Sequence, residues 1–487
     1  MTNQQLTPLF SKLMEHLHKK SYSFHVPGHK WGSVFPEIGR GSFASILKLD
    51  ATELNGLDDL HDAQTIIKEA QQLLADAYGA ASSYFLVGGS TVGNLAMILS
   101  VCKKDEIILV QRDSHKSVMN GIQLAQATPI YLTPNYDEDT RLSTGVSLET
   151  VIEAIQTYPK AKALFLTNPS YYGITTNLEE IIKTAHQSNI PVLIDEAHGA
   201  HFGLGEGLPA AALSQGADVV VQSAHKTLPA MTMGSFLHVN SAFISNEKIA
   251  YYLQVLQSSS PSYPILASLD LARYYAANLN QEEISAIVES SQQFKNQLKE
   301  IPQITVVELK ESASLTTDPL KITLRTNCEL TGIEIQRLLE EKNIYIELAN
   351  EELLLLVLPL APFKETQSIL PVLKSVLKPY KVKERISSHQ KVELQRLSSL
   401  NLTQEAMSSY DTKNVRLEDS AGYLIAEPII PYPPGVPILI PGETITEEKI
   451  ATILKLINAE TRFQGHTNLK ETGVKVFIID ERKEDEE

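Results

Sequence analysis

Apolar and polar positions follow two distinct patterns between residues 66 and 224. Residues 83–87, 106–110 and 191–194 are almost continuously apolar, which predicts strands buried on both faces. Residues 66–79 instead repeat apolar side chains at helical spacing and end at a glycine, which predicts an amphipathic helix. Strands of this kind separated by helices predict an α/β fold with a mainly parallel sheet covered by helices.

The same patterns predict the remaining elements of this region. Helices are expected at 88–102, 115–127, 147–159 and 177–189, and further strands at 128–132, 161–167 and 217–224, with the strand at 191–194 extending to 197.

The two ends of the chain follow other patterns. Residues 1–62 have no sustained period and two turn-rich stretches, at 25–32 and 54–62, so we expect them to be irregular. On the C-terminal side we expect one long helix at 273–297 and then a smaller α+β unit with strand 318–326, helix 331–343 and strand 353–360. A solvated helix at 381–399 and a last α+β unit with proline-rich turns are expected to follow. The acidic end at 480–487 is expected to be frayed.

Composition narrows the class of protein. The chain has 487 residues, 43% of them hydrophobic and 21% charged, which is typical of a globular protein with a large core. Its net charge of −16 argues against a nucleic-acid partner or an anionic membrane surface, and is compatible with a cationic small substrate. With two cysteines, no apolar run of about 20 residues and no signal-peptide core, we expect a cytoplasmic protein without a metal site.

Reactive side chains follow several predicted strands. Ser90 and Thr91 lie in the glycine-rich turn "GGSTVGN", His115 follows strand 106–110, and Asp195 ends the apolar run at 191–194. Because the carboxyl ends of parallel strands line a crevice, these side chains are expected to lie near one another. Each has an ordinary alternative: a plain turn, a surface histidine or a capping aspartate.

The stretch "DVVVQSAHKTLPAMTMGSFLHV" adds Ser223, His225 and Lys226 directly after a buried strand. A lysine there is commonly solvated, but a desolvated lysine forms Schiff bases. One ligand accounts for all these loops. Pyridoxal phosphate needs hydroxyls and amides for its phosphate, a lysine for its aldehyde, a flat partner for its ring and a carboxylate for its pyridine nitrogen.

These motifs together resemble the ornithine/lysine/arginine decarboxylases of the major bacterial type, which are fold type I pyridoxal phosphate enzymes. The resemblance rests on "SAHKTLPAMTMGSFLHV" with "DEAHGAHFG" upstream, and extends to "FHVPGHKWG", "RDSHKS", "SSSPSYPILASLD", "DPLKITL" and "IIPYPPGVPILIPGE". It covers nearly the whole chain and looks most like the shorter members. It implies an N-terminal segment at 1–62, a cofactor-binding domain at 63–272, a small α+β domain at 273–380 and a C-terminal decarboxylase domain at 381–487.

The resemblance also implies roles for individual residues. Lys226 would form the Schiff base, Asp195 would pair with the pyridine nitrogen and His115 would stack on the ring. Ser90 and Thr91 would hold the phosphate with Ser223 and His225 beside them, and His198 would lie near the cofactor or the substrate carboxylate. Ser259 and Ser262 would reach the site of a neighbouring subunit, which implies a homodimer or a larger homo-oligomer. Met233 departs from the family, in which a glutamine is common at this position.

The substrate is expected to be a basic amino acid, which needs an acidic pocket at its far end. Glu427 and Glu443 lie among rigid proline turns and are candidates for that pocket, as are Asp58 and Asp59; the alternative is that the glutamates are exposed groups on structural turns. The resemblance favours arginine, with agmatine as the product and polyamine biosynthesis as the context, ahead of lysine and ornithine. An aminotransferase or lyase of the same fold and a non-catalytic paralogue remain alternatives.

Overall fold

The structure is a computed structural model of the 487-residue chain. It describes residues 3–19, 21–137, 139–140, 142–310, 312, 314–383, 396–402, 404–432, 437–458, 462–463, 465–466 and 468–479. The elements expected from the sequence can be compared with these residues only. The acidic end at 480–487, most of the helix expected at 381–399 and the centre of the turn "PYPPGVP" lie outside them.

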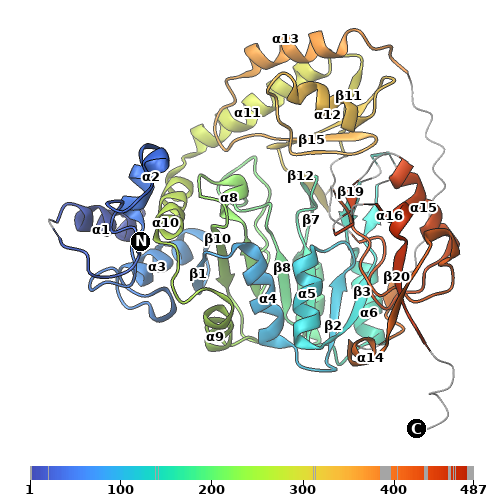
Figure 1. Ribbon diagram of the computed structural model, residues 1–487, viewed down its shortest axis with the longest axis horizontal. Helices are drawn as coiled ribbons and strands as arrows, with labels where there is room; N and C mark the ends of the chain where they lie inside the picture. Colours follow the sequence, from blue (N-terminus) through green and yellow to red (C-terminus); the bar gives the residue numbers. More distant parts are fainter. Residues whose placement is uncertain are drawn as a thin grey trace.

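A central sheet organises the protein (Figure 1). Within the described residues it has eight strands in the order β1 (Ser82–Leu86), β10 (Ser235–Val239), β9 (Val219–Gln222), β8 (Val192–Asp195), β6 (Ala163–Thr167), β2 (Ile107–Gln111), β3 (Thr128–Leu132) and β16 (Leu397–Ser399). Strands β9, β8, β6, β2 and β3 run parallel, whereas β10 pairs antiparallel with both β1 and β9, and β16 pairs antiparallel with β3. The mainly parallel sheet predicted from the sequence is confirmed.

Helices cover both faces of this sheet, because successive strand side chains alternate between two apolar clusters. Leu193 and Val221 point to the face covered by α4 (Gly89–Val101), α5 (Lys116–Ala125) and α9 (Asn246–Leu256). Ile194 and Val220 point to the face covered by α6 (Leu148–Thr157) and α7 (Glu179–Gln187). The fold is therefore a three-layer α/β architecture.

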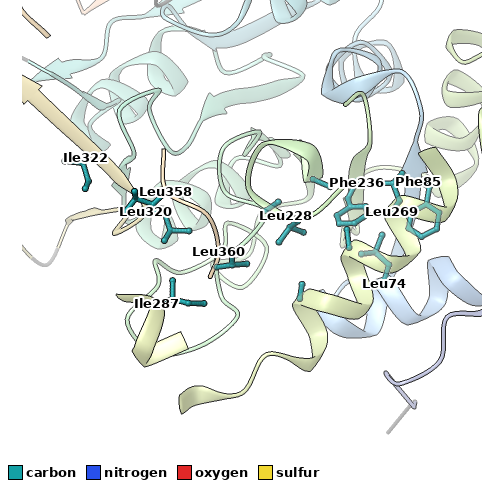
Figure 2. Close-up of a cluster of buried hydrophobic side chains, with 14 of the residues drawn as sticks. Leu74, Phe85, Leu228, Phe236, Leu269, Ile287, Leu320, Ile322, Leu358 and Leu360 are labelled. Carbon is teal, nitrogen blue, oxygen red and sulfur yellow. The ribbon is translucent and has the colours of Figure 1, made fainter. Parts of the chain in front are cut away.

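A third apolar cluster joins distant parts of the chain. It includes Phe85 of β1 and Phe236 of β10, with α3 (Ile66–Tyr78) and α10 (Tyr263–Asn278) packed over them, and it continues to Ile322 and Leu358 (Figure 2). This cluster fixes the smaller α+β unit relative to the main sheet. Burial of apolar area stabilises a packed state by about 25 cal/mol per Å². The shared cluster therefore stabilises the packing of the two units against each other.

The smaller unit has a four-stranded sheet in the order β11 (Ile304–Val306), β13 (Lys321–Thr326), β15 (Leu353–Val357) and β14 (Leu348–Ala349). Helices α11 (Gln281–Leu298), α12 (Gly332–Glu340) and α13 (Thr366–Leu377) accompany it (Figure 1). The predicted strand–helix–strand order is confirmed. The prediction of a single helix at 273–297 is wrong. The helix α10 ends at Asn278, and α11 begins as a separate helix with a capping box formed by Asn280 and Glu283.

The N-terminal segment corrects another expectation. It contains α1 (Pro8–Leu17) and α2 (Glu37–Leu49), so residues 1–62 are not irregular throughout. The backbone N–H groups of Leu9 and Phe10 donate to Oδ2 of the buried Asp270, at 3.1 and 3.2 Å. The start of α1 is thus capped by a residue from α10, which no local pattern reveals.

The C-terminal unit has its own apolar cluster, with residues such as Leu417, Ile425 and Val476. It contains β17 (Thr412–Val415) paired with β20 (Val474–Phe477), and α15 (Glu447–Asn458). The helix expected at 381–399 is wrong at its end, because Leu397–Ser399 forms β16 at the edge of the main sheet.

Shorter elements complete the described chain. They are α8 (Ala224–Thr227), α14 (Gln404–Ser409), α16 (Leu469–Thr472), β4 (Asn135–Tyr136), β5 (Ser143–Gly145), β7 (Ile174–Thr176), β12 (Leu315–Thr317), β18 (Pro431–Tyr432), β19 (Arg462–Phe463) and the 3-10 turns Leu60–Asp62 and Leu417–Asp419. None of the helices described is both long and apolar enough to cross a bilayer.

Candidate active site

Two loops at the carboxyl ends of neighbouring parallel strands bring Lys226 and His198 together. Lys226 lies on the short helix α8 after β9, and His198 lies in the loop after β8. The Lys226 Nζ and His198 Nε2 atoms are 3.0 Å apart. The Lys226 side chain is exposed in part, so its amine is reachable from outside.

The electrostatic surroundings lower the pKa of both groups. Burial of the amine lowers the pKa of Lys226, although the carboxylates of Asp195 and Glu347 oppose this shift. The pKa of His198 is held well below its ordinary value by burial and then by the charges of Lys321 and Lys226. The neutral amine is the nucleophilic form, so a lowered pKa favours attack of Lys226 on a carbonyl carbon.

Asp195, at the end of β8, is 2% exposed and is held by two donors. The Asn94 Nδ2 atom donates to its Oδ2 at 2.8 Å, and the Ala197 N–H donates to its Oδ1 at 3.1 Å. Asn94 lies on α4 beside Gly93, where a Cβ would be 2.4 Å from Val221 Cγ2. The glycine therefore lets the helix approach the strand closely enough for Asn94 to reach the carboxylate.

His115 caps α5 and is connected to Asp195 through two side chains. Its Nδ1 atom is 2.8 Å from Ser117 Oγ, which in turn accepts from Asn94 Nδ2 at 2.9 Å. Burial lowers the pKa of His115, and the charge of Asp195 opposes this. Sequence reasoning found His115 and Asp195 but missed Asn94 and Ser117. Their polar types within an apolar helical pattern were the available signal.

Polar groups gather at the N-terminus of α4. Gly89 has φ of +75°, and a Cβ on Gly88 would lie 2.6 Å from Val92 Cγ2, so both positions favour glycine. Ser223 Oγ donates to Ser90 Oγ at 2.9 Å, which places the two hydroxyls side by side. First-turn N–H groups of a helix lack intrahelical acceptors, so they and the hydroxyls of Ser90 and Thr91 can receive an anion.

The residues that follow Lys226 fix its loop to the N-terminus of α4. The Met233 carbonyl accepts from Gly89 N–H at 2.8 Å, and His225 Nδ1 donates to the Gly234 carbonyl at 2.9 Å. Met233, the position that departs from the family, thus contributes through its backbone, with φ of +77° and a half-exposed side chain.

Ser259 and Ser262 are not joined to these residues by a hydrogen bond within the described part of the chain. The nearby Gln257 accepts from Val87 N–H at 2.9 Å, which holds the start of their segment beside β1. Their predicted contribution to a neighbouring site stays a prediction.

A second group, which sequence reasoning did not assign, adjoins His198. The Tyr171 and His198 ring centroids are 4.7 Å apart, and Lys321 Nζ donates to the Tyr171 carbonyl at 2.6 Å. The Tyr171 hydroxyl donates to Glu347 Oε1 at 2.7 Å. Burial lowers the pKa of Lys321 to about 7. Lys321 belongs to "DPLKITL", so that motif supplies a buried amine next to the site.

The four acidic candidates for a substrate pocket are engaged elsewhere. Glu443 accepts from Arg112 and from Lys449, at 2.8 Å for Arg112 Nη2 and 3.0 Å for Lys449 Nζ. Glu427 accepts from Lys475 N–H at 2.7 Å. Asp58 caps α3 by accepting from backbone N–H groups including that of Thr65, and Asp59 accepts from His61 N–H. Each carboxylate therefore has a structural partner within this chain.

A lysine with a lowered pKa, a buried aspartate and the N-terminus of α4 thus lie at the carboxyl ends of the parallel strands of an α/β sheet. The chain belongs to the Orn/Lys/Arg decarboxylase family: the model of the family's major domain matches residues 7–317, and the model of its C-terminal domain matches residues 384–469. It is a pyridoxal phosphate-dependent amino-acid decarboxylase.

Curated relatives agree with this assignment. The chain is 46% identical over 480 residues to the uncharacterized protein YaaO of Bacillus subtilis (strain 168), covering 98% of this chain and 99% of that protein. It is 33% identical over 472 residues to an arginine decarboxylase of the same organism, covering 95% and 96% of the two chains.

Solved structures support the fold. The Francisella novicida lysine decarboxylase LdcF aligns with a TM-score of 0.81 at 20% identity, covering 98% of this chain and 81% of that one. Sphingomonas wittichii serine palmitoyltransferase aligns with a TM-score of 0.51 at 18% identity, covering 64% and 76%. The predicted fold type I architecture is confirmed.

Proposed function

We propose that this protein decarboxylates a basic amino acid, with arginine as the substrate and agmatine and carbon dioxide as the products. The observation that carries the proposal is the pairing of the Lys226 amine with His198, next to the buried Asp195. The names of the relatives support the choice of arginine, since chains 33–35% identical to this one are named arginine decarboxylase. Lysine and ornithine are the remaining candidates.

The residues present fit pyridoxal phosphate as the cofactor. The amine of Lys226 suits the aldehyde, and the carboxylate of Asp195 suits a protonated pyridine nitrogen. Ser90, Thr91 and the first-turn N–H groups of α4 suit the phosphate, beside Ser223. The ring of His115, anchored by Ser117, suits a stacking partner. When bound, the cofactor supplies an electron sink for the electron pair that remains as carbon dioxide leaves.

The side chains of this protein then have distinct tasks. Lys226 would hold the aldehyde group of the cofactor until the substrate amine takes its place. Asp195, whose two oxygens are oriented by Asn94 and the Ala197 N–H, would hold a proton on the pyridine nitrogen. Lys226 would be displaced with the proton that the substrate ammonium gives up, and the pair of Lys226 and His198, 3.0 Å apart, would deliver that proton to the substrate Cα after carbon dioxide has left.

The charge near the site supports a cationic substrate. The carboxylate of Glu347 is exposed, accepts one hydrogen bond from Tyr171, and lies near enough to raise the pKa of Lys226. It therefore adds negative potential near Lys226, in addition to the overall net charge of −16.

We further propose a homodimer or larger homo-oligomer in the cytoplasm, with a role in polyamine biosynthesis. In the N-terminal segment, five large apolar side chains are strongly exposed: Tyr22, Phe24, Val26, Val34 and Ile38. Contact with a second copy of the chain would remove them from water. Cys102 and Cys328 are both free and buried, which supports a reducing compartment.

The test is carbon dioxide release by the purified protein with pyridoxal phosphate, offered arginine, lysine and ornithine separately, with identification of the amine. We expect agmatine from arginine, and no product from Lys226→Ala. The exposed Lys183→Ala is the matched control and should retain full activity. A cofactor absorbance lost in Lys226→Ala without carbon dioxide from any of the three substrates would refute the reaction while leaving the cofactor site intact.

A further inference from the structure

Asn94 connects the two groups that the proposed function assigns to the cofactor ring. Its side chain is fully buried, and both of its amide protons are used. One goes to Asp195 Oδ2 at 2.8 Å and the other to Ser117 Oγ at 2.9 Å. Because a carboxylate accepts and does not donate, the amide nitrogen and not its oxygen must face Asp195.

This orientation of the amide determines the direction of the hydrogen bond between Ser117 and His115. Ser117 Oγ already accepts from Asn94, so its own hydroxyl proton is available to His115 Nδ1, 2.8 Å away. The Ser117 N–H points at the same Nδ1 atom at 3.3 Å. With two donors aimed at it, Nδ1 must be the unprotonated nitrogen, so the neutral ring carries its proton on Nε2.

The remaining atom of the amide shows that Asn94 is not placed for stability alone. Asn94 Oδ1 is buried and has no hydrogen-bond partner among the described residues. Leaving a buried acceptor unpaired costs the free energy of removing it from water. An apolar side chain would avoid this cost, so the two donated hydrogen bonds are the function that the residue provides.

We propose that Asn94 is a positioning residue that orients Asp195 and, through Ser117, fixes His115 as its Nε2-protonated tautomer. The inference rests on the proposed function for the roles of Asp195 and His115, but the tautomer is a property of the chain itself. One residue thereby sets both the carboxylate that faces the pyridine nitrogen and the ring that covers the cofactor.

The test uses full-length protein labelled with ¹⁵N-histidine, without and with pyridoxal phosphate. The signal of His115 is identified by its absence in His115→Gln. In the native chain we expect the shift of an unprotonated Nδ1 and a protonated Nε2. In Ser117→Ala and in Asn94→Leu we expect a second population with Nδ1 protonated, whereas Ser117→Thr, which keeps the hydroxyl, should preserve the native spectrum.

The two sites of substitution separate the two halves of the proposal. Asn94→Leu should also weaken cofactor binding about tenfold and lower kcat about 100-fold with little change in KM, because Asp195 loses its orientation. Ser117→Ala should change the tautomer with a smaller loss of kcat, since the Asn94–Asp195 bond remains. Native His115 shifts in both Ser117→Ala and Asn94→Leu would overturn the proposal. If Asn94→Leu fails to fold, native shifts in Ser117→Ala alone would do so. Absence of decarboxylation with the tautomer as expected would refute the proposed function and leave this inference standing.

Discussion

Asp195 and Glu196 are consecutive carboxylic acids with opposite surroundings. Both are almost fully buried, at 2% and 0% exposure. Asp195 accepts from Asn94 and lies close enough to Lys226 for its charge to shift the pKa of that lysine. Glu196 accepts from the side chain of Gln222 at 2.7 Å and from Ala212 N–H at 2.8 Å. The first acid borders the site, whereas the second is enclosed by protein.

The enclosed acid ends a polar chain that crosses four strands. Ser83 of β1 contacts His238 of β10 at 2.7 Å, His238 contacts Gln222 of β9 at 3.1 Å, and Gln222 reaches Glu196 directly after β8. Burial raises the pKa of Glu196 to about 8, although its hydrogen bonds oppose the shift. Glu196 is therefore neutral at pH 7, which is how a buried acid without a cation avoids the cost of its charge.

The difference teaches that burial alone does not identify a functional acid. A carboxylate near the Lys226 amine can act on a ligand, whereas a neutral carboxyl group that accepts hydrogen bonds from two amides joins strands. Three substitutions test this comparison, and they are described from the largest expected effect to the smallest.

Exchange of each acid for its amide gives the largest contrast. Asp195→Asn should lower kcat by about three orders of magnitude, because removing one charge of a buried pair costs about 3–5 kcal/mol. Glu196→Gln should change kcat less than about threefold, since its acid is already neutral. Steady-state carbon dioxide release measures both. Equal losses in the two variants would show that the neighbouring acids are not functionally distinct.

The pH dependence of stability should reveal the second acid. The folded-state pKa of Glu196, about 8, is above its unfolded value of 4.5, so its contribution is fully present below pH 4.5 and is lost as the pH rises through 8. Urea unfolding should therefore show Glu196→Gln gaining stability relative to the native chain between pH 5 and pH 9, by roughly 2–4 kcal/mol. A difference independent of pH would contradict the neutral state of Glu196.

Substitution of Lys321 should have a smaller effect, which acts on His198 of the candidate active site. Its charge lowers the pKa of His198, so Lys321→Met should raise that pKa and move the acidic limb of the kcat/KM profile upward by less than about one unit. Burial holds the pKa of Lys321 at about 7, below its unfolded value, so the cost of its charge is largest below pH 7. The variant should therefore gain more stability at pH 6 than at pH 9. An unchanged pH profile, with Lys310→Met as the exposed control, would show that Lys321 does not act on His198.

Several misses in the fold share one physical cause. The helix α1 was missed because its first turn is capped by Asp270, which is about 260 residues away along the chain. The strand β16 was missed because its pairing with β3 gives three residues their structure, whereas the local sequence is charged and polar. In both cases a distant partner overrides the local pattern, and a single sequence does not display that partner.

The site shows the same division. Lys226, Asp195 and His115 were predicted from their positions after apolar strands, and the structure brings them together with His198. Asn94 was missed because its polar type within an apolar helical pattern does not specify which strand end it faces. Glu443 was predicted as an acidic residue of the substrate pocket, but it forms an ion pair with Arg112. That pair depends on the packing of the C-terminal unit against the main sheet, which the sequence does not show.

The sequence alone determined the order of the main strands and helices, the chemistry of the strand-end loops and the family, because apolar periodicity and short motifs are local properties. Only the tertiary structure decided which polar side chains share a hydrogen bond. It placed Asn94 between Asp195 and His115, and it enclosed Glu196 beyond reach of the site. Hydrogen-bond distances of about 3 Å depend on the packing of elements far apart in the chain, and no local pattern specifies that packing.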